Sequence, residues 1–361
     1  MPIVAHTSLP SFEDLRRAGQ EVLSLDGALH QDIRELHIGL LNMMPDAALR
    51  VTERQFLRMV GNSNKIAQLY VHLFTVPGLQ RNDETRAYIN EHYTTFDALR
   101  NDGLDALIIT GANVANPTLV EEPFWQPLEE VVEWASKRVT SVLCSCLATH
   151  SLLKHFHGID RVLLPSKRWG VYEHRVTTPE HPLLRDVNTR FDVPHSRHND
   201  IDRSQFERAG LTVLAESAEG GVHLAVSADQ FRVVYFQGHP EYDINSLLKE
   251  YVREAYRWFA GERDDEPPYP EHYFSAAAAA LAERWWEEAR SARLEGAPCP
   301  GFPEQDVLQL LDNTWGDSGK AFFNNWLGAV YRLTHRDRGK VFDDGVDPED
   351  PLGLLKRGAG R

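Results

Sequence analysis

A short apolar stretch that passes abruptly from a strand pattern into a helix pattern constrains the fold most. Residues 139–143 read Val-Thr-Ser-Val-Leu, a β-branched run typical of a strand covered on both faces. From Leu147 onward the apolar residues follow near-helical spacing, and Cys146 lies at the junction. A thiol in such a turn faces the helix amino terminus, whose free N–H groups and partial positive charge lower a thiol pKa. Two interpretations stay open: a reactive cysteine, or two inert core cysteines, Cys144 and Cys146.

Three strand patterns precede this stretch, at residues 36–41, 66–74 and 104–109. A helix pattern separates the first two strands, and another at residues 124–138 leads into the cysteine strand. We expect the first of these helices to open at residues 52–55, where Thr-Glu-Arg-Gln has the form of a capping box. Strands that alternate with helices predict a doubly wound α/β fold with a mostly parallel sheet and flanking helices.

The chain divides into four parts by pattern and composition. We predict an N-terminal arm at 1–34 with one helix near 12–25, an α/β domain at 35–262, a C-terminal helical extension at 263–335, and a charged tail at 336–361. A proline-rich linker after the helix at 245–260 motivates the second boundary. The glycine-rich and charged composition of the tail predicts that it is frayed.

Composition excludes several classes of function. The formal net charge of -15 argues against nucleic-acid binding and against binding to a membrane surface, because both favour basic patches. No apolar run is long enough to span a membrane, and the first residues lack the pattern of a signal peptide. Three cysteines are too few for a disulfide framework, and Cys144-x-Cys146 lacks the second pair of a zinc site. We therefore expect a cytoplasmic protein without a bound metal.

A histidine and a carboxylate follow the last strand pattern, at residues 231–237. His239 and Glu241 lie two residues apart, and in extended backbone such residues point to the same face. Glu241 could hold one ring nitrogen of His239 and leave the other free, as in a nucleophilic triad with Cys146. The alternative is a pair of exposed turn residues, since the chain has 16 histidines.

Several separated motifs together resemble one enzyme family. The motifs are Leu41-Asn42-Met43-Met44-Pro45, Thr110-Gly111-Ala112, Gly170-Val171-Tyr172-Glu173-His174, Pro194-His195-Ser196-Arg197, Gly238-His239-Pro240-Glu241-Tyr242-Asp243 and Phe323-Asn324-Asn325-Trp326-Leu327. They resemble the homoserine O-acyltransferase family, whose members transfer a succinyl or acetyl group from coenzyme A to L-homoserine in methionine biosynthesis. The resemblance covers residues 35 to 335, with an insertion near 275–310, and residues 35–262 would form the catalytic domain.

The resemblance implies a class I glutamine-amidotransferase-like fold and a set of site residues. It assigns the nucleophile to Cys146 rather than Cys144, and the catalytic histidine and glutamate to His239 and Glu241. Its remaining assignments are Lys167 and Ser196 for contact with the substrate, Arg253 for the homoserine carboxylate, and the backbone N–H of Leu147 for the oxyanion. It also implies a ping-pong reaction through an acyl-thioester, no cofactor beyond the coenzyme A substrate, and a homodimer.

The acyl donor depends on one position. In the family, glycine after the Thr-Gly-Ala motif accompanies succinyl-CoA and glutamate accompanies acetyl-CoA; the matching residue here is Ala115. Alanine neither fills the space nor repels a succinyl carboxylate, so we expect succinyl-CoA. The chain departs from the family at three places: Asp46-Ala47 replaces a lysine pair, Leu147 replaces tryptophan, and Asn113 replaces proline.

Four alternatives stay open at this point. The donor could be acetyl-CoA. The acceptor could be L-serine, which is one methylene shorter than L-homoserine, because a pocket discriminates against such a difference by only about 1–3 kcal/mol. The triad could serve a hydrolase or an amidotransferase. The fold could also carry a non-catalytic binding module, since a fold does not fix a function.

Overall fold

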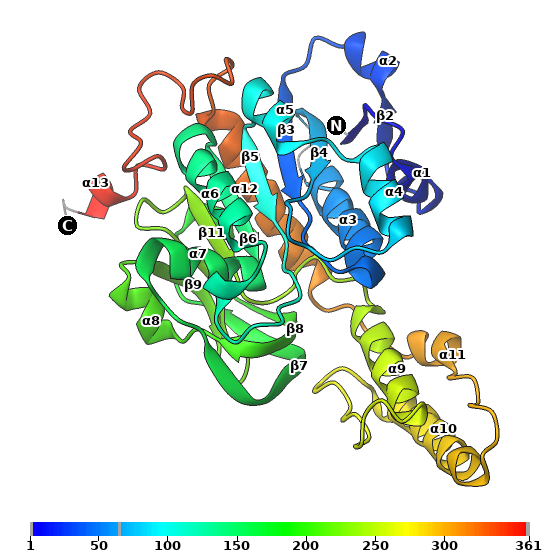
Figure 1. The fold of residues 1–361 in the computed structure, drawn as a ribbon. Coiled ribbons are helices and arrows are strands. Elements are labelled where there is room, and N and C mark those ends of the chain that lie inside the picture. Colours follow the sequence, from blue (N-terminus) through cyan, green and yellow to red (C-terminus); the bar gives the residue numbers. More distant parts are fainter. Residues whose placement is uncertain (1–2, 64–65, 359–361) are drawn as a thin grey trace.

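The sheet of the computed structural model, which describes residues 3–63 and 66–358, runs through the whole α/β part of the molecule. Within the described residues, eleven strands form it in the order β2-β1-β4-β3-β5-β6-β11-β10-β9-β7-β8 (Figure 1). Neighbours from β2 to β11 are parallel, and neighbours from β11 to β8 are antiparallel. The predicted doubly wound α/β class with a mostly parallel sheet is confirmed.

The strands fall into two groups along the sheet. The parallel group is β1 (Ile3–Ala5), β2 (Val22–Ser24), β3 (Glu35–Leu41), β4 (Gln68–Phe74), β5 (Ala106–Ile109), β6 (Ser141–Ser145) and β11 (Val233–Phe236). The antiparallel group is β7 (Val162–Val176), β8 (Arg190–Asp200), β9 (Thr212–Ser217) and β10 (Gly221–Val226). Every residue of β5 and β6 is buried, as expected for central parallel strands with helices on both faces.

Helices cover both faces of the sheet (Figure 1). One face packs against α1 (Pro10–Arg17), α3 (Asp46–Gly61) and α12 (Gly316–Leu333). The other packs against α5 (Phe96–Asp102), α6 (Trp125–Arg138), α7 (Leu147–His157) and α8 (Arg203–Arg208). Shorter or peripheral helices are α2 (Leu25–Leu29), α4 (Asp83–His92), α13 (Leu355–Gly358) and the 3-10 turns η1 (Leu119–Glu121) and η2 (Pro182–Leu184).

A helical lobe projects from the carboxyl end of the parallel strands (Figure 1). It consists of α9 (Ser246–Phe259), α10 (Ala276–Glu295) and α11 (Glu304–Leu308), which share an apolar core. Trp285 and Trp286 of α10 are buried in that core, so α10 is more than the surface helix that its alanine- and glutamate-rich sequence predicts. The predicted boundary after residue 262 falls between α9 and α10, which pack in the same lobe.

The N-terminal residues differ from the predicted arm with one helix near residues 12–25. The helix is α1, which ends at Arg17, and the chain then forms β2. β1 pairs with both β2 and β4, so this segment extends the parallel sheet. Strands of three residues carry too little periodicity to be recognised in a sequence.

The predicted capping box at residues 52–55 is wrong. α3 begins six residues earlier, at Asp46, and Pro45 is its N-cap residue. Thr52 and Glu53 therefore lie inside the helix and are buried. Glu53 accepts hydrogen bonds from Ser11 and from the hydroxyls of Tyr88 and Tyr93, which satisfy a buried carboxyl group.

The C-terminal tail is more ordered than its composition predicts. Thr334 pairs with Phe342 in a β-bridge, and buried Asp350 accepts hydrogen bonds from the N–H groups of Leu354, Leu355 and Lys356. Residues 359–361 of the predicted tail lie outside the described residues. Among the described helices, none combines the length and the apolar character that a membrane crossing requires.

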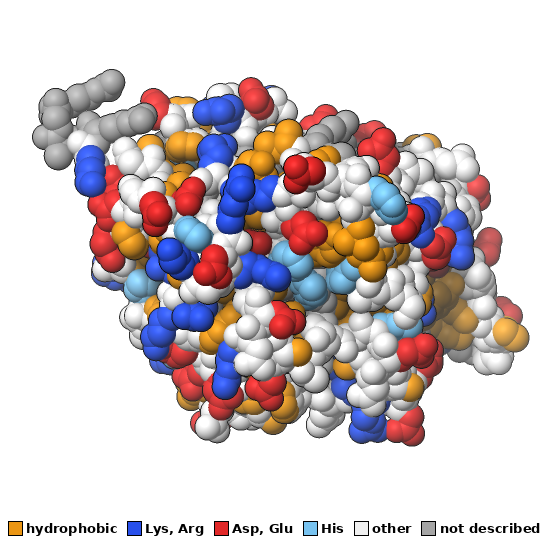
Figure 2. Space-filling model, turned by 90° about the horizontal axis from the view of Figure 1, so that it is seen from above, with side chains coloured by type: hydrophobic (Ala, Val, Ile, Leu, Met, Phe, Trp, Pro, Cys, Tyr) orange, Lys and Arg blue, Asp and Glu red, His pale blue; other side chains and the backbone are white. Residues whose placement is uncertain are grey.

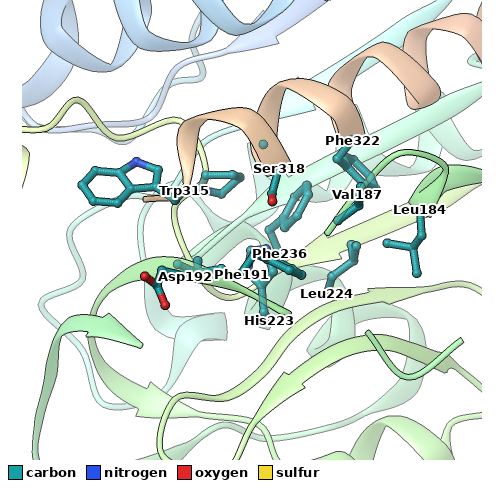
Figure 3. A pocket seen from close by; sticks show the side chains of 13 residues that line it. Leu184, Val187, Phe191, Asp192, His223, Leu224, Phe236, Trp315, Ser318 and Phe322 are labelled. Carbon is teal, nitrogen blue, oxygen red and sulfur yellow. The ribbon is translucent and has the colours of Figure 1, made fainter. Parts of the chain in front are cut away.

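A small apolar pocket lies where α12 meets the antiparallel half of the sheet. Ser318 and Phe322 of α12 face Leu224 and Phe236 of the sheet, with Trp315 at the helix start (Figure 3). Its lining includes Pro240 and Gly319. α12 thus packs directly behind the loop that follows β11.

Candidate active site

Cys146 occupies the sharp turn between β6 and α7. Its backbone has φ +53° and ψ -110°, and α7 starts at the next residue, Leu147. A non-glycine residue rarely adopts a positive φ, and such strain is typical of functional turns. The turn places the thiol at the amino terminus of α7, where the first N–H groups lack partners within the helix.

Gly111 forms the opposite wall of this turn. It follows β5, the neighbour of β6 in the sheet. A Cβ built on Gly111 would lie 3.7 Å from the Cβ of Cys146, from the backbone N of Leu147 and from the Sδ of Met44. Glycine therefore keeps open the space beside the thiol and the Leu147 N–H, where the oxyanion of a tetrahedral intermediate would form.

His239 and Glu241 lie at the same edge of the sheet because β11 is the parallel neighbour of β6. The Nδ1 of His239 lies 2.9 Å from the Oε1 of Glu241, and the hydroxyl of Ser145 donates to the same oxygen at 3.2 Å. His239 and Glu241 are both buried, and the Nε2 of His239 has no hydrogen-bond partner among the described residues. Glu241 thus orients the ring and leaves Nε2 for the thiol and the substrate.

The charges at this site favour an ion pair of thiolate and imidazolium. Burial alone would lower the pKa of His239, but the charges of Glu241 and Cys146 raise it to about 10. Burial alone would raise the pKa of the Cys146 thiol, but the charge of His239, supported by Arg197, brings it below its ordinary value. At neutral pH the thiol is therefore prepared as a nucleophile, and the histidine carries the proton.

The loop that carries His239 is fixed by three elements. A Cβ on Gly238 would come within 2.8 Å of Val193 and His195 on β8, so only glycine permits this close packing. Arg58 of α3 donates to the carbonyl of Glu241 at 2.8 Å and pairs with Asp243. Two groups from the start of α12 complete the support. The indole of Trp315 donates to the carbonyl of Tyr242 at 2.9 Å, and Gly319 packs against Pro240.

Two predicted substrate-binding residues, Lys167 and Ser196, converge on a carboxylate that the sequence did not reveal. The Oε2 of Glu250 on α9 accepts from Lys167 Nζ at 3.0 Å and from Ser196 Oγ at 2.7 Å. The other oxygen of Glu250 accepts from the hydroxyl of Tyr242 at 3.0 Å, and the Tyr242 ring stacks on His239 with centroids 4.3 Å apart. This polar network therefore reaches His239.

Charge balance keeps Glu250 ionised in this network. Burial alone would raise its pKa, but the charge of Lys167 and the hydrogen bonds from Ser196 and Lys167 bring it below its ordinary value. The network thus offers an ammonium, a carboxylate and two hydroxyls in a cluster that reaches His239 through the Tyr242 ring. Those groups suit an amino-acid substrate, which carries both charges.

Comparison with known proteins decides the family. Residues 2–336 match the family model described as HTS, homoserine O-succinyltransferase. The homoserine O-succinyltransferase of Methylococcus capsulatus is 59% identical over 98% of this chain and 100% of its own length, and that of Nitrosococcus oceani is 58% identical over 99% of both chains. This chain belongs to the homoserine O-succinyltransferase family. The resemblance inferred from the motifs is confirmed, and with it the assignment to a family of acyltransferases.

The solved structures that resemble this chain are less similar to it in sequence than the members of its own family are. A glutamine amidotransferase from Thermotoga maritima has 12% identity and a TM-score of 0.41, over 82% of this chain and 98% of that chain. One from Methylobacillus flagellatus has 13% identity and a TM-score of 0.41, over 82% of this chain and 95% of that chain.

The structure brings together most of the predicted site residues but leaves two at a distance. Arg253 lies on α9, one turn after Glu250; its side chain is 56% exposed and bonds Glu254 at 3.2 Å. Within the described residues it makes no hydrogen bond with Lys167, Ser196 or Cys146. Its role toward the homoserine carboxylate, which the family resemblance implies, stays a prediction.

Ala115 lies on the exposed loop after β5. Its N–H donates at 2.7 Å to Glu122, a buried carboxylate that also accepts from the N–H of Asn116 at 2.6 Å. Glu122 thus fixes the loop that carries the predicted donor-specificity residue. The effect of Ala115 on the donor stays a prediction.

Sequence reasoning missed Arg197, Glu250 and Tyr242. Arg197 is buried on β8, where it bonds Asp200 at 3.0 Å and the carbonyl of Gly220 at 2.7 Å, and its charge acts on Cys146. Its place in the Pro-His-Ser-Arg motif was the one available signal. Tyr242 lies within the histidine motif, which gave no sign of its contact with Glu250, and Glu250 follows that motif on a helix, where charged residues are ordinary.

The structure also separates the two neighbouring cysteines. Cys144 is fully buried in β6, and burial raises its pKa well above the ordinary value. All three cysteines are free, and no cluster of three metal-ligating side chains occurs within the described part of the chain. Of the two interpretations of the cysteine stretch, the inert one fits Cys144 and the reactive one fits Cys146.

Proposed function

We propose that this chain transfers the succinyl group of succinyl-CoA to the hydroxyl of L-homoserine through a thioester on Cys146. The observation that carries the proposal is the pair of half-buried Cys146 and buried His239, held by Glu241, in a chain that matches the homoserine O-succinyltransferase family over nearly its full length. The proposed reaction needs no resident cofactor.

In the first half-reaction, the Cys146 thiolate attacks the thioester carbonyl of the donor. The Leu147 N–H, at the start of α7 and beside Gly111, stabilises the oxyanion; one such donor contributes about 3–4 kcal/mol. The bond between the acyl carbon and the coenzyme A sulfur breaks. The leaving thiolate takes the proton held on Nε2 of His239, and the succinyl group stays on Cys146.

In the second half-reaction, the neutral His239 takes the proton of the homoserine hydroxyl as its oxygen attacks the acyl-cysteine. The bond from the acyl carbon to Sγ breaks, which releases O-succinyl-L-homoserine and restores the ion pair. A positioned general base of this kind contributes roughly 10²–10⁴-fold to the rate. Glu241 keeps Nδ1 protonated and Nε2 directed at the substrate.

The network around Glu250 supports recognition of the amino-acid acceptor. Glu250 can accept from the α-ammonium group of homoserine, and Lys167 can donate to its carboxylate after a rotamer change. Arg253 is one helical turn away on α9 and would add a second donor for the carboxylate. The small side chain of Ala115 supports succinyl-CoA as the donor, because it leaves space and adds no negative charge.

Intact-mass measurement tests the proposal. The protein is mixed with succinyl-CoA or acetyl-CoA in the absence of an acceptor, beside Cys146→Ala and the matched control Cys144→Ala. We expect a succinyl adduct on the wild-type and Cys144→Ala proteins, none on Cys146→Ala, and discharge by L-homoserine but not by L-serine. An acetyl adduct alone would contradict succinyl-CoA as the donor. The absence of any adduct would contradict the ping-pong reaction.

A further inference from the structure

Arg81 is a buried cation, and two of its three side-chain nitrogens are unpaired among the described residues. It lies on the loop of residues 75–82 between β4 and α4, at the same edge of the sheet as Cys146, and its side chain is 7% exposed. Its Nη1 donates to the carbonyl of Met44 and lies 3.5 Å from Asp46. Its Nε and Nη2 are buried, with no hydrogen-bond partner in the part of the chain that the structure describes.

These two free donors form one edge of the guanidinium group. Nε–H and one N–H of Nη2 point in the same direction, the geometry that accepts a carboxylate with two parallel hydrogen bonds. Leaving a buried charged donor unsatisfied costs free energy, and native structures rarely do so without a reason. Asp46 does not fill this edge: it faces Nη1, and its second oxygen accepts from the N–H of Asn82 at 2.8 Å.

The surroundings add further positive potential. α3, a helix of 16 residues, begins beside Arg81 at Asp46, and its N-cap residue Pro45 has no side chain that could cap it. The first N–H groups of α3 therefore carry the partial positive charge of a helix terminus. Thr75, on the same loop as Arg81, has a buried hydroxyl with no hydrogen-bond partner within residues 3–63 and 66–358.

Met44 connects this cation to the nucleophile. The Met44 carbonyl accepts a hydrogen bond from Arg81. At its other end, the Met44 side chain reaches Gly111: a Cβ built on Gly111 would lie 3.7 Å from the Sδ of Met44 and also 3.7 Å from the Cβ of Cys146. The Met44 side chain is half-buried and, being long and unbranched, can change rotamer to open the space between. A succinyl group carries its carboxylate two methylenes beyond the thioester carbonyl, roughly 4 Å from it at standard bond lengths.

We infer that Arg81 receives the terminal carboxylate of the acyl group and so selects a dicarboxylic acyl donor. The inference rests on the proposed succinyl transfer and adds the residue that recognises the donor. Coenzyme A phosphates are the other anions of the substrate, but they lie at the far end of the pantetheine arm, whereas Met44 joins Arg81 to the turn that carries Cys146.

The test measures equilibrium binding of succinyl-CoA and acetyl-CoA to the Cys146→Ala protein, which cannot form the thioester. The test variant adds Arg81→Met, and the matched control adds Arg86→Met, an exposed arginine of α4 paired with Asp83. We expect Arg81→Met to weaken succinyl-CoA binding about 10- to 100-fold, the range for a lost charged hydrogen bond, and to leave acetyl-CoA within about twofold. Arg81→Lys should fall between, because it keeps the charge without the fork.

Two results would overturn the inference. Equal weakening of both donors would mean a phosphate contact or a general disturbance of the loop, and unchanged binding of succinyl-CoA would mean that the free edge of Arg81 holds no part of the substrate. Thermal unfolding of each variant shows whether it folds. Failure of the proposed function would appear separately, as the absence of a succinyl adduct on wild-type Cys146.

Discussion

Two groups of histidines, at different parts of the parallel sheet, differ in charge at neutral pH: one is protonated and the other is neutral. At the carboxyl edge, the pKa of His239 is raised to about 10 despite burial, because Glu241 and Cys146 face it. Within two other strands, His37 of β3 and His72 of β4 stack with centroids 5.1 Å apart, and burial together with the charge of Arg338 and neighbouring histidines lowers both pKa values to about 3. Histidine side chains are visible on the face seen from above (Figure 2).

The difference lies in the partners and not in the residue type. His239 has a buried carboxylate on one nitrogen and a thiol that gives up its proton near the other. His37 bonds the Nε2 of His72 at 2.9 Å, and its carboxylate contact is with Glu35, which is 45% exposed. A solvent-exposed carboxylate compensates little of the cost of burying an imidazolium ion. Of the two groups, therefore, only the one at the carboxyl edge is protonated at neutral pH and can donate a proton in a reaction.

The largest expected effect is the removal of the carboxyl-edge histidine. His239→Asn should lower kcat for succinyl transfer by roughly 10²–10⁴-fold, because the general base and the partner of the thiolate are both lost. His37→Asn, the matched change in the other group, should leave kcat within about twofold. Steady-state kinetics of both variants measure the contrast, and comparable losses would break the distinction between the two groups.

Removal of the carboxylate should have a smaller effect. Glu241→Gln keeps an acceptor for Nδ1 but removes the charge that raises the pKa of His239, so that pKa should fall from about 10. We expect kcat to fall about 10- to 100-fold, a typical cost of losing the group that orients a histidine. The pH profile of kcat/KM reports the pKa change, and an unchanged profile would show that Glu241 acts by position alone.

Loss of a contact that supports the loop carrying His239 should lower kcat by less again. Arg58→Met removes the donor to the Glu241 carbonyl and the ion pair with Asp243. The free energy of unfolding should fall by about 1–3 kcal/mol, and kcat should fall severalfold while His239 and Cys146 remain. Urea unfolding and kinetics measure the two effects. A loss of stability without any change in kcat would mean that the loop keeps its geometry without Arg58.

The smallest effect concerns acid stability. Between about pH 3 and 6.5 the unfolded chain holds a proton on His37 that the folded chain does not, so the free energy of unfolding falls as the pH is lowered through that window. His37→Asn should reduce the slope of the free energy of unfolding against pH by the contribution of up to one bound proton. The carboxyl-edge pair should add little near neutral pH, because folding only moves one proton from Cys146 to His239. Unfolding at several pH values tests this, and a slope unchanged by His37→Asn would contradict it.

The sequence predicted the frame of the site better than its fine structure. The strand at residues 139–143 and the helix after it are β6 and α7, and the order of strands and helices predicted the parallel sheet. Parallel strands end at a common edge, so the meeting of Cys146 with His239 followed from topology. The capping box failed because a Thr-x-x-Gln pattern is local, whereas the start of α3 is set by Pro45 at the edge of the sheet.

Contacts between distant segments could not be predicted. Arg197, Glu250 and Arg81 bond groups in other elements that lie 23 to 83 positions away along the chain. The residues next to Glu250 and Arg81 in the sequence give no sign of these contacts. The antiparallel extension and the short β1 strand likewise depend on pairing that no local pattern fixes. Arg253 was assigned by family resemblance, and its exposed position on α9 leaves that assignment to experiment.

The pH dependence of thiolate formation tests the central claim most directly. The ultraviolet absorbance of the thiolate is followed through a pH titration in the wild-type, Cys146→Ala, Cys144→Ala and His239→Asn proteins. We predict a step that Cys146→Ala removes and Cys144→Ala keeps, at a pH below the ordinary thiol value of 9.0, and that His239→Asn moves to higher pH. A wild-type step at or above that value, or one unmoved by His239→Asn, would contradict the ion pair at the carboxyl edge of the sheet.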